Sequence, residues 1–367
     1  MLTTATLRDK ILGSLAGACL ADALGAPTEQ RSIREIREMF GGRVETFVAP
    51  PADSPFAHGK AAGHITDDSS QLLMLAEAYI RHGGVITPEV VADMLIRWSG
   101  NPEYFPHFAG PSTRAAIELL KAGADPRETG KRGRLTTEGT SNGGAMRVAP
   151  AGLVHAGNVE AAVRDAHINC IPSHHTNIGV AGAGAIAASV ATALLPTASL
   201  TDIVRAARTG ATLGAALGSR EGRHVAGPSV AARIDLACSL ALRADDIDEA
   251  VEAITATVGT GLAAAEACPA AVGFVVAAGG DPYLAAIAAT NAGDDSDTVG
   301  CMAGSIAGAL SGIQAIPEEL YKQVCEVNNL DLEALADRLT PLAERSLQSA
   351  ARPTARSVLK PVRGLSG

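Results

Sequence analysis

Residues 7–24, LRDKILGSLAGACLADAL, carry apolar side chains at helical spacing and small residues at every fourth position. The small residues are Gly13, Gly17, Ala21 and Gly25, and the same spacing returns at Gly300, Gly304, Gly308 and Gly312. Residues four apart lie along one face of a helix, and glycines there remove the side chains that keep two helix axes apart. Glycine costs about 1 kcal/mol relative to alanine inside a helix, so coincidence in a chain rich in small residues is the only alternative to a structural purpose. We therefore expect both helices to pack closely against neighbours, which would place Asp22 and Glu29 near Asp295.

Outward from these two segments, the sequence keeps returning to helical patterns separated by loops that carry proline and glycine. The further helices that we expect are 69–81, 87–98, 112–122, 159–169, 177–195, 200–217, 229–242, 247–258, 263–278, 282–291, 318–328 and 331–349. Alternating patterns typical of strands are almost absent. The sequence predicts one all-α domain, a compact orthogonal multi-helix bundle over residues 1–350, followed by a flexible basic C-terminal tail, residues 351–367.

Composition narrows the class of protein. The 367 residues are 47% hydrophobic and 19% charged, which suits a large packed core and argues against disorder. A net charge of −9 argues against a nucleic-acid partner. Neither a signal sequence nor a membrane span is evident, so we expect a cytoplasmic protein without a membrane partner. The six cysteines form no CxxC pair and are expected to be buried thiols.

Two acidic clusters lie far apart in the sequence and share one chemistry. They supply Thr66, Asp67 and Asp68 in one segment, and Asp295, Asp297 and Thr298 in the other. Each cluster alone is explained as a helix N-cap with acids in the first turn. However, adjacent carboxylates repel each other unless a cation or proton separates them, and both clusters contain such pairs. Carboxylates and hydroxyls are hard oxygen ligands, so the two clusters together predict a site for two Mg²⁺ or Mn²⁺ ions.

Four segments, taken in order, resemble the ADP-ribosylglycohydrolases, the family of the dinitrogenase reductase-activating glycohydrolase. They are Gly13–Gly17 with Asp22–Glu29, Thr66–Ser69, Asn142–Pro150 and Asp294–Thr298 with Ala303-Gly304. Any one of them is weak evidence, but four in family order over most of the chain are specific. The resemblance implies an all-α fold, a binuclear Mg²⁺ or Mn²⁺ centre, and hydrolysis of the N- or O-glycosidic bond at the anomeric carbon of ADP-ribose.

Carried over by position, the resemblance also implies roles for individual residues. The family's metal ligands fall on Thr66, Asp67, Asp68, Asp295, Asp297 and Thr298. Glu29 falls on the acidic residue that closes over the metals in relatives, and it is our first choice for the catalytic base. An aspartate of the metal set, Asp295, is the second choice. Asp22 is expected to anchor the loop or orient a ligand from behind the metal site.

The stretch 139–147 has a composition suited to binding phosphate or ribose, since its glycines expose backbone N–H groups. The predicted substrate-binding residues are Ser141, Asn142, Gly143, Gly144, Met146, Arg147 and His174. The alternatives are a structural glycine-rich turn, an arginine paired with carboxylates of its own fold, and a structural histidine. A partial zinc site of Cys170, His174 and His175 is a further, weaker possibility, since it lacks a fourth ligand.

Three functions remain open at the level of sequence. The leading hypothesis is a metal-dependent glycohydrolase acting on ADP-ribosylated protein or a free ADP-ribose derivative. The second keeps the metals and the fold but acts on a small N-ribosyl compound such as a nucleoside, because the motifs concern ribose and metal more than diphosphate. Residues 139–141 also lack the aromatic that some relatives stack on adenine or the distal ribose, which leaves the substrate open. The third is a catalytically silent, crystallin-like binding protein, against which the intact set of acids argues.

Overall fold

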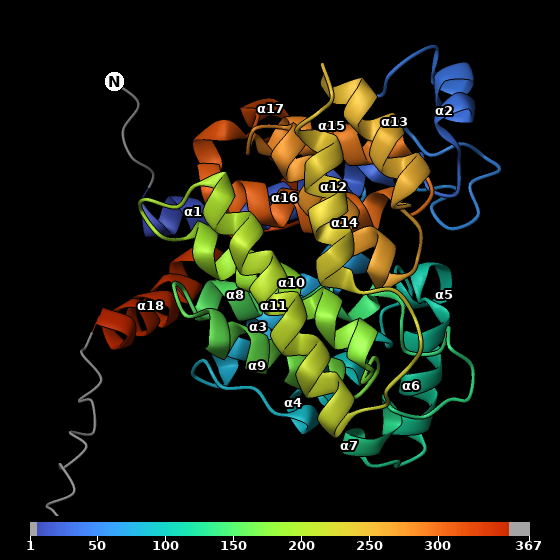
Figure 1. Ribbon diagram of the computed structural model, residues 1–367. Coiled ribbons are helices and arrows are strands. Elements are labelled where there is room, and N and C mark those ends of the chain that lie inside the picture. Colours follow the sequence, from blue (N-terminus) through green and yellow to red (C-terminus); the bar gives the residue numbers. More distant parts are fainter. Residues whose placement is uncertain (1–5, 352–367) are drawn as a thin grey trace, which may run out of the picture.

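The computed structural model describes residues 6–351, and this part of the chain is all-α, as predicted. Its helices are α1 (Leu7–Gly25), α2 (Ile33–Phe40), α3 (Asp67–Arg81), α4 (Pro88–Trp98), α5 (Phe105–Phe108), α6 (Pro111–Lys121), α7 (Pro126–Thr129), α8 (Ala149–Val154), α9 (Val159–Cys170), α10 (Asn177–Ala193), α11 (Leu200–Glu221), α12 (Val230–Ala241), α13 (Ile247–Thr257), α14 (Ala264–Ala277), α15 (Pro282–Ala292), α16 (Ser296–Ser311), α17 (Glu318–Asn328) and α18 (Leu332–Ala351), with 3₁₀ turns η1 (Asn142–Gly144) and η2 (Ile313–Ala315) (Figure 1). The extended pairing within residues 6–351 is limited to two isolated bridges. Of the predicted tail 351–367, only Ala351 lies among the described residues.

The two glycine stripes lie against each other, which confirms the predicted close packing. A Cβ atom added to Gly17 would lie 2.4 Å from the carbonyl oxygen of Gly304, and one added to Gly304 would lie 2.1 Å from that of Gly17. Gly13 and Gly308 make the same reciprocal approach one turn away. The backbones of α1 and α16 are therefore in direct contact, and no side chain other than hydrogen fits between them.

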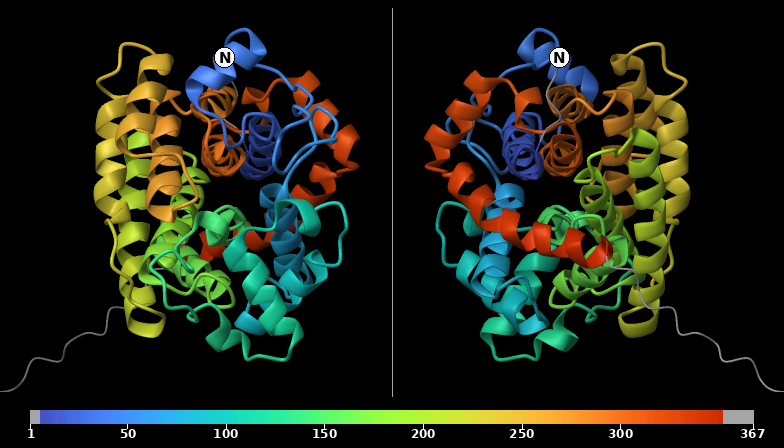
Figure 2. Two further views of the ribbon diagram at one scale, coloured as in Figure 1. Left: turned by 90° about the vertical axis from the view of Figure 1, so that its right-hand side faces the viewer. Right: turned by 90° about the vertical axis from the view of Figure 1, so that its left-hand side faces the viewer.

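This antiparallel pair brings the end of α1 to the beginning of α16. A Cβ atom on Gly25 would lie 2.5 Å from the backbone nitrogen of Asp297. Figure 2 shows α1 and α16 side by side, with the helices of residues 67–170 below them. The start of α3 joins the same region, because the carboxylate of Asp22 on α1 accepts hydrogen bonds from the backbone N–H groups of Thr66 and Ser69. Three helix ends thus meet at one point.

A second glycine contact holds the interior helix α10. A Cβ atom on Gly210 of α11 would lie 2.1 Å from the carbonyl oxygen of Gly184 on α10. Nearly all of α10 is buried, as expected for an apolar segment inside a protein. The hydrophobic core around it is built from residues throughout the sequence, the first of them Ile11 and the last Ala343. Within the described part of the chain, each helix is too short or too polar to cross a bilayer.

The short helices α5, α7 and α8 were not predicted. α5 and α7 lie in 100–111 and 123–144, which were expected to be loops because they carry proline and glycine, whereas the segment of α8 was given no assignment. Each of the three has a proline in its first turn, which fits the start of a helix. α2 was missed despite a capping box between Ser32 and Glu35. The six cysteines are free; five are buried, as predicted, and Cys325 is half-buried.

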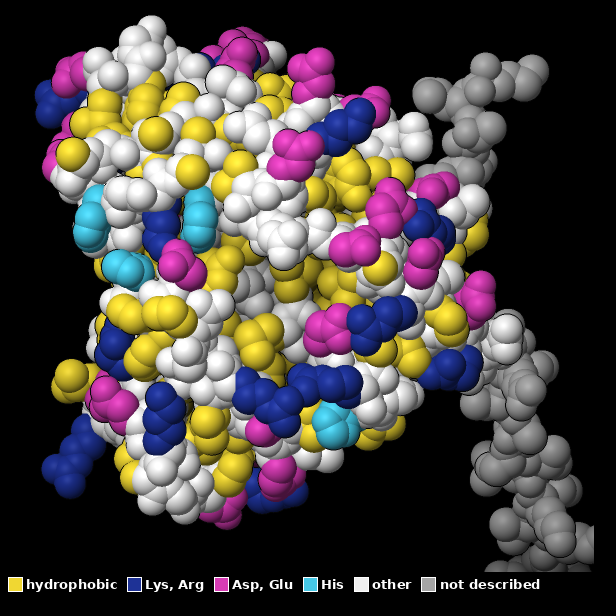
Figure 3. All heavy atoms as spheres, turned by 180° about the vertical axis from the view of Figure 1, so that it is seen from behind, with side chains coloured by type: hydrophobic (Ala, Val, Ile, Leu, Met, Phe, Trp, Pro, Cys, Tyr) yellow, Lys and Arg dark blue, Asp and Glu magenta, His cyan; other side chains and the backbone are white. Residues whose placement is uncertain are grey.

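The surface carries mixed charge. Figure 3 shows the face opposite to that of Figure 1, where Lys and Arg side chains are interspersed with Asp and Glu side chains. A hollow lies near the middle of this face. Many of the ion pairs recorded within residues 6–351 are exposed, such as Arg37 with Glu252 and Lys322 with Glu318. Such pairs contribute little to stability.

Candidate metal centre and ligand site

Six acidic side chains meet where the three helix ends converge, and all of them are buried. They are Asp22 of α1, Glu29 of the following loop, Asp67 and Asp68 at the start of α3, and Asp295 and Asp297 at the start of α16. The most exposed of the six, Asp67, retains only 8% of its accessible surface. The predicted convergence of the two acidic segments is therefore present in the structure.

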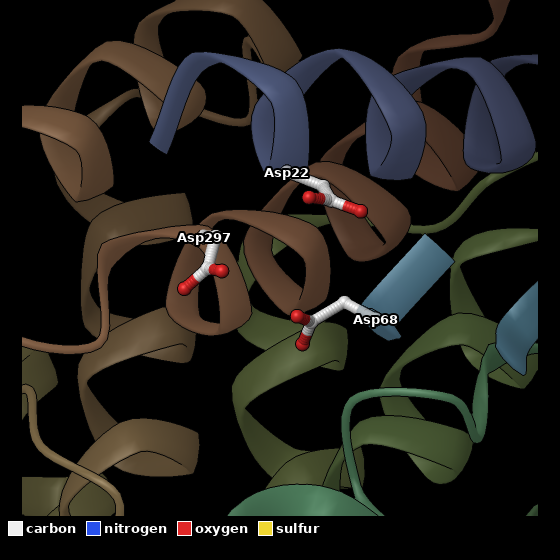
Figure 4. A group of neighbouring side chains, drawn as sticks. All are labelled: Asp22, Asp68 and Asp297. Atoms are coloured by element: carbon white, nitrogen blue, oxygen red, sulfur yellow. The ribbon is translucent and has the colours of Figure 1, made fainter. Parts of the chain in front are cut away.

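The carboxylates form two overlapping groups. Asp22, Asp68 and Asp297 each offer an oxygen within 4.8 Å of the others, and so do Glu29, Asp295 and Asp297. Figure 4 shows the first group, in which the three carboxylates come from α1, α3 and α16 and point toward one shared space. Asp297 belongs to both groups. Two positions with one common carboxylate are the arrangement expected of a binuclear site.

Asp22 has a structural bond as well as a place in the first group. Its two oxygens lie 3.0 Å from the N–H of Thr66 and 3.0 Å from that of Ser69, so it caps the amino end of α3. Sequence reasoning expected this anchoring role but did not place Asp22 among the three converging carboxylates. The sequence indicated that Asp22 lies near α16, because Asp22 directly follows Ala21, a member of the small-residue stripe that faces that helix.

Hydrogen bonds join the loop that carries Glu29 to the start of α16 and to Asp294, which precedes that helix. The Thr28 hydroxyl donates to the carbonyl of Gly25 and contacts the Ser296 hydroxyl at 3.0 Å. Backbone bonds join Gln30 N–H to the Asp294 carbonyl and Asp294 N–H to the Arg31 carbonyl. These bonds hold the Glu29 carboxylate beside Asp295 and Asp297, the other members of the second group, and its buried Oε2 atom has no hydrogen-bond partner among the described residues.

The remaining predicted ligands lie around the same space. The Thr66 hydroxyl donates to Asp68 Oδ2 at 2.8 Å, and the Thr298 side chain faces Asp68 and Asp295. Asp67 belongs to neither group of three; its Oδ2 atom lies 3.3 Å from the amide nitrogen of Gln71. Its neighbours still include Asp68, Asp22 and Asp295, whose charges act on it.

Burial and mutual repulsion disfavour the charged form of the carboxylates in this cluster. Burial, followed by repulsion from Asp68, raises the pKa of Asp22 and of Asp295 to about 7. Burial and neighbouring acids raise the pKa of Glu29, Asp67 and Asp297 well above the usual range. None of the ion pairs found in residues 6–351 includes any of the six acids.

The donor set therefore fits divalent cations. Six buried carboxylates that repel one another are stabilised when a cation lies between them. Two buried oxygens of the cluster, Glu29 Oε2 and Asp68 Oδ1, have no hydrogen-bond partner among residues 6–351, so each is free to meet a cation or a water molecule. All the available donors are oxygens, as Mg²⁺ and Mn²⁺ prefer.

The stretch 139–147 folds next to this cluster. Asn142 donates from its side-chain amide to Asp295 Oδ2, so it serves the acidic site directly. Ser141 is partly exposed, and its Oγ atom lies 2.9 Å from Nε2 of His174. Gly143 and Gly144 form η1 and lie against the His174 side chain, where a Cβ atom on Gly143 would be 2.9 Å from Cε1. Met146 is in the buried core.

Arg147 is fully buried, and its guanidinium has no free N–H group. Nε donates to the Asn169 side chain, Nη1 to Gln71 and to the Gly143 carbonyl, and Nη2 to the Ser173 hydroxyl and the Asn169 carbonyl. These acceptors are uncharged, whereas the sequence alternative assumed carboxylates. Burial lowers the pKa of Arg147 to about 10. The arrangement favours a supporting role over direct contact with a phosphate.

The geometry of Cys170, His174 and His175 does not support the possible zinc site. The two ring nitrogens of His174 contact the hydroxyls of Ser141 and Ser173, and Nε2 of His175 contacts His167 at 2.8 Å. The Cys170 thiol points to the Gly179 carbonyl. The groups suited to a metal within the described residues are the two acidic ones alone.

Comparison with known proteins gives one consistent result. A family model described as ADP-ribosylglycohydrolase matches residues 3–349. The chain is 31% identical over 339 residues to the uncharacterized protein YegU of Escherichia coli (strain K12), covering 90% of this chain and 96% of that protein. It is 26% identical to the ADP-ribosylarginine hydrolase Tri1 of Pseudomonas putida (strain GB-1), over 88% of this chain and 76% of Tri1. A solved structure titled ADP-ribosylglycohydrolase-related protein complex shares the fold, with a TM-score of 0.64 at 22% identity over 92% of this chain and 99% of the other.

Proposed function

The chain belongs to the ADP-ribosylglycohydrolase family and is a glycosyl hydrolase, and from that premise we propose a specific reaction. The enzyme hydrolyses the glycosidic bond at the anomeric ribose carbon of an ADP-ribosyl derivative, with two divalent cations, Mg²⁺ or Mn²⁺, at the acidic cluster. The observation that carries this proposal is the pair of carboxylate groups that share Asp297.

The proposed ligand sets follow from the two groups. Asp22, Asp68 and Asp297 would hold one ion, and Asp295 and Asp297 would hold the other, with the Glu29 carboxylate beside them. Thr66, Asp67 and Thr298 complete the donors available around them, as the family resemblance implies. When bound, two divalent cations supply the positive charge that the cluster lacks and act as Lewis acids toward ribose hydroxyls and water.

The protein itself moves the proton and stabilises developing charge. Glu29 is the proposed general base, because its Oε2 atom is buried, has no hydrogen-bond partner in the described part of the chain and lies beside Asp295 and Asp297. Asp295 is the second candidate, and the Asn142 amide fixes its orientation. As the glycosidic bond breaks, positive charge grows on the anomeric carbon and ring oxygen, and surrounding carboxylates favour that charge.

Direct hydrolysis tests the proposal. ADP-ribosyl-arginine, ADP-ribosyl-serine and O-acetyl-ADP-ribose are each incubated with the enzyme and Mg²⁺, Mn²⁺ or EDTA, and release of ADP-ribose is measured. We expect release from at least one substrate with metal and its loss in EDTA. Equal rates with metal and EDTA would contradict the proposed role of the cations. If no ADP-ribose is released from any of the three compounds, ADP-ribosyl derivatives are excluded as the class of substrate.

A smaller ribosyl substrate is the second candidate, and one observation favours it. Met146 and Arg147 are buried, and Arg147 has no free donor, so two of the predicted ligand contacts do not face an open site. This leaves fewer groups to bind a diphosphate.

Ligand-induced stabilisation separates the two candidates. A ligand that binds only the folded state stabilises it, by about 2.7 kcal/mol when the ligand concentration is a hundred times Kd. The melting temperature rises as a result. With Mg²⁺ present, we expect ADP-ribose to raise the melting temperature, and adenosine and ribose to have no effect. If adenosine alone raises the melting temperature under the same conditions, the substrate is a nucleoside and not a compound that contains a diphosphate.

A further inference from the structure

A chain of hydrogen bonds connects the buried Arg147 to the partly exposed Ser141. Arg147 Nη2 lies 2.7 Å from Ser173 Oγ, which lies 2.8 Å from Nδ1 of His174. On the other side of the ring, His174 Nε2 lies 2.9 Å from Ser141 Oγ. The chain thus contains one group that can only donate, the guanidinium, and three that can both donate and accept.

The guanidinium sets the direction of the first bond. Arginine cannot accept, so the Ser173 oxygen accepts from Arg147 and retains one proton to donate. Ser173 Oγ has two recorded contacts within the described chain, Arg147 and His174, and the residue is only 5% exposed. Its proton therefore has one available acceptor, Nδ1 of His174. The opposite arrangement, with the proton on Nδ1, would leave a buried hydroxyl proton without an acceptor.

Two features limit His174 to a single proton and a single orientation. Its ring is fully buried, and burial together with the Arg147 charge lowers its pKa to about 3, so it is neutral at physiological pH. Gly143 packs against Cε1 and Nε2, and turning the ring over would place carbon atoms at both serine hydroxyls. With Nδ1 accepting, the single proton lies on Nε2 and is donated to Ser141 Oγ.

We propose that Arg147, Ser173 and His174 are positioning residues that turn the Ser141 hydroxyl into a hydrogen-bond donor toward the ligand. Because Ser141 already accepts from His174, its own proton points away from the ring. The ligand atom that it meets must then accept a hydrogen bond, as a phosphoryl oxygen of an ADP-ribosyl compound does. This last step rests on the proposed function, whereas the direction of the chain depends only on the protein.

The direction is tested by NMR of the unmodified enzyme with ¹⁵N-labelled histidine. We expect His174 to carry its proton on Nε2, with Nδ1 unprotonated, and the Ser173→Ala variant to lose this preference. The Ser173→Thr variant, which keeps the hydroxyl, is expected to restore it. A proton on Nδ1 in the wild type overturns the proposal whatever the variants do, and so does an unchanged tautomer in folded Ser173→Ala.

The consequence for the ligand is tested by a double-mutant cycle in ADP-ribose binding, measured by calorimetry with Mg²⁺. We expect Ser141→Ala and Ser173→Ala each to weaken binding by about tenfold, which is about 1.4 kcal/mol. The double variant is expected to bind no more weakly than Ser141→Ala, because Ser173 acts through Ser141. Independent, additive losses would overturn the coupling. Wild-type enzyme that fails to bind ADP-ribose would count against the proposed function, while the NMR result still decides the direction of the chain.

Discussion

Replacing Asp297 with asparagine is expected to lower kcat/KM by at least about 10³-fold, equivalent to about 4 kcal/mol of transition-state stabilisation. Asp297 is the one residue that both carboxylate groups contain, so its loss removes a ligand from each proposed ion at once. Asparagine has nearly the same shape, and it keeps one oxygen but not the charge. The rate is measured by release of ADP-ribose at saturating Mg²⁺.

Stability measurements separate this effect from misfolding. Removing one carboxylate from a buried, mutually repelling set is expected to leave the melting temperature in EDTA unchanged or higher. The rise in melting temperature that Mg²⁺ causes in the wild type is expected to disappear. A variant that keeps both this rise and full turnover would contradict the shared role of Asp297.

The neighbouring Asp294 provides a matched control. It is exposed, belongs to neither group, and has a left-handed backbone with φ of 56°, which asparagine tolerates well. Asp294→Asn makes the same chemical change three residues away, and we expect kcat/KM to stay within about threefold of the wild type, under 1 kcal/mol. A large loss in this control would show that general charge, and not the ligand set, determines activity.

Replacing Gly304 with alanine is expected to destabilise the fold by at least about 3 kcal/mol, the upper part of the range for overpacking. The added Cβ atom would lie 2.1 Å from the backbone oxygen of Gly17, so α1 and α16 must separate. Separation also moves Asp22 away from Asp297, and activity should fall together with stability. Urea denaturation measures the free energy of unfolding.

Gly110→Ala is the control for the methyl group itself. Gly110 has φ of −65°, and nothing lies within 4 Å of a Cβ atom built there. We expect the free energy of unfolding to change by less than about 1 kcal/mol, or to rise slightly, because alanine restricts the unfolded chain. Equal effects of the two substitutions would mean that the backbone contact between α1 and α16 contributes nothing specific.

The sequence predicted the architecture best where one pattern had one physical cause. Small residues at every fourth position in residues 13–25 and 300–312, all of them glycine except Ala21, implied direct backbone contact, and that contact brings the acidic segments together. The short helices α5, α7 and α8 were missed because the same prolines start a helix or a loop, and only tertiary packing decides between them.

The site was predictable as a set of residue types but not as a set of bonds. The small-residue stripe predicted that Asp22 lies near Asp295, but its approach to Asp68 and its bonds to Thr66 and Ser69 appear only in the fold. Arg147 was predicted as a possible phosphate ligand. All five of its N–H groups instead donate to Gln71, Gly143, Asn169 and Ser173. These acceptors are scattered along the sequence and form no motif around Arg147. No local pattern distinguishes a buried arginine that supports a loop from an exposed one that binds a ligand.

Anomalous diffraction from crystals soaked in Mn²⁺ shows directly whether the acidic cluster binds two divalent cations. We predict two peaks, one among Asp22, Asp68 and Asp297 and the other among Glu29, Asp295 and Asp297, with both ions contacting Asp297. A single peak outside these carboxylates, or no peak at a Mn²⁺ concentration that supports full activity, would contradict a binuclear site at these residues.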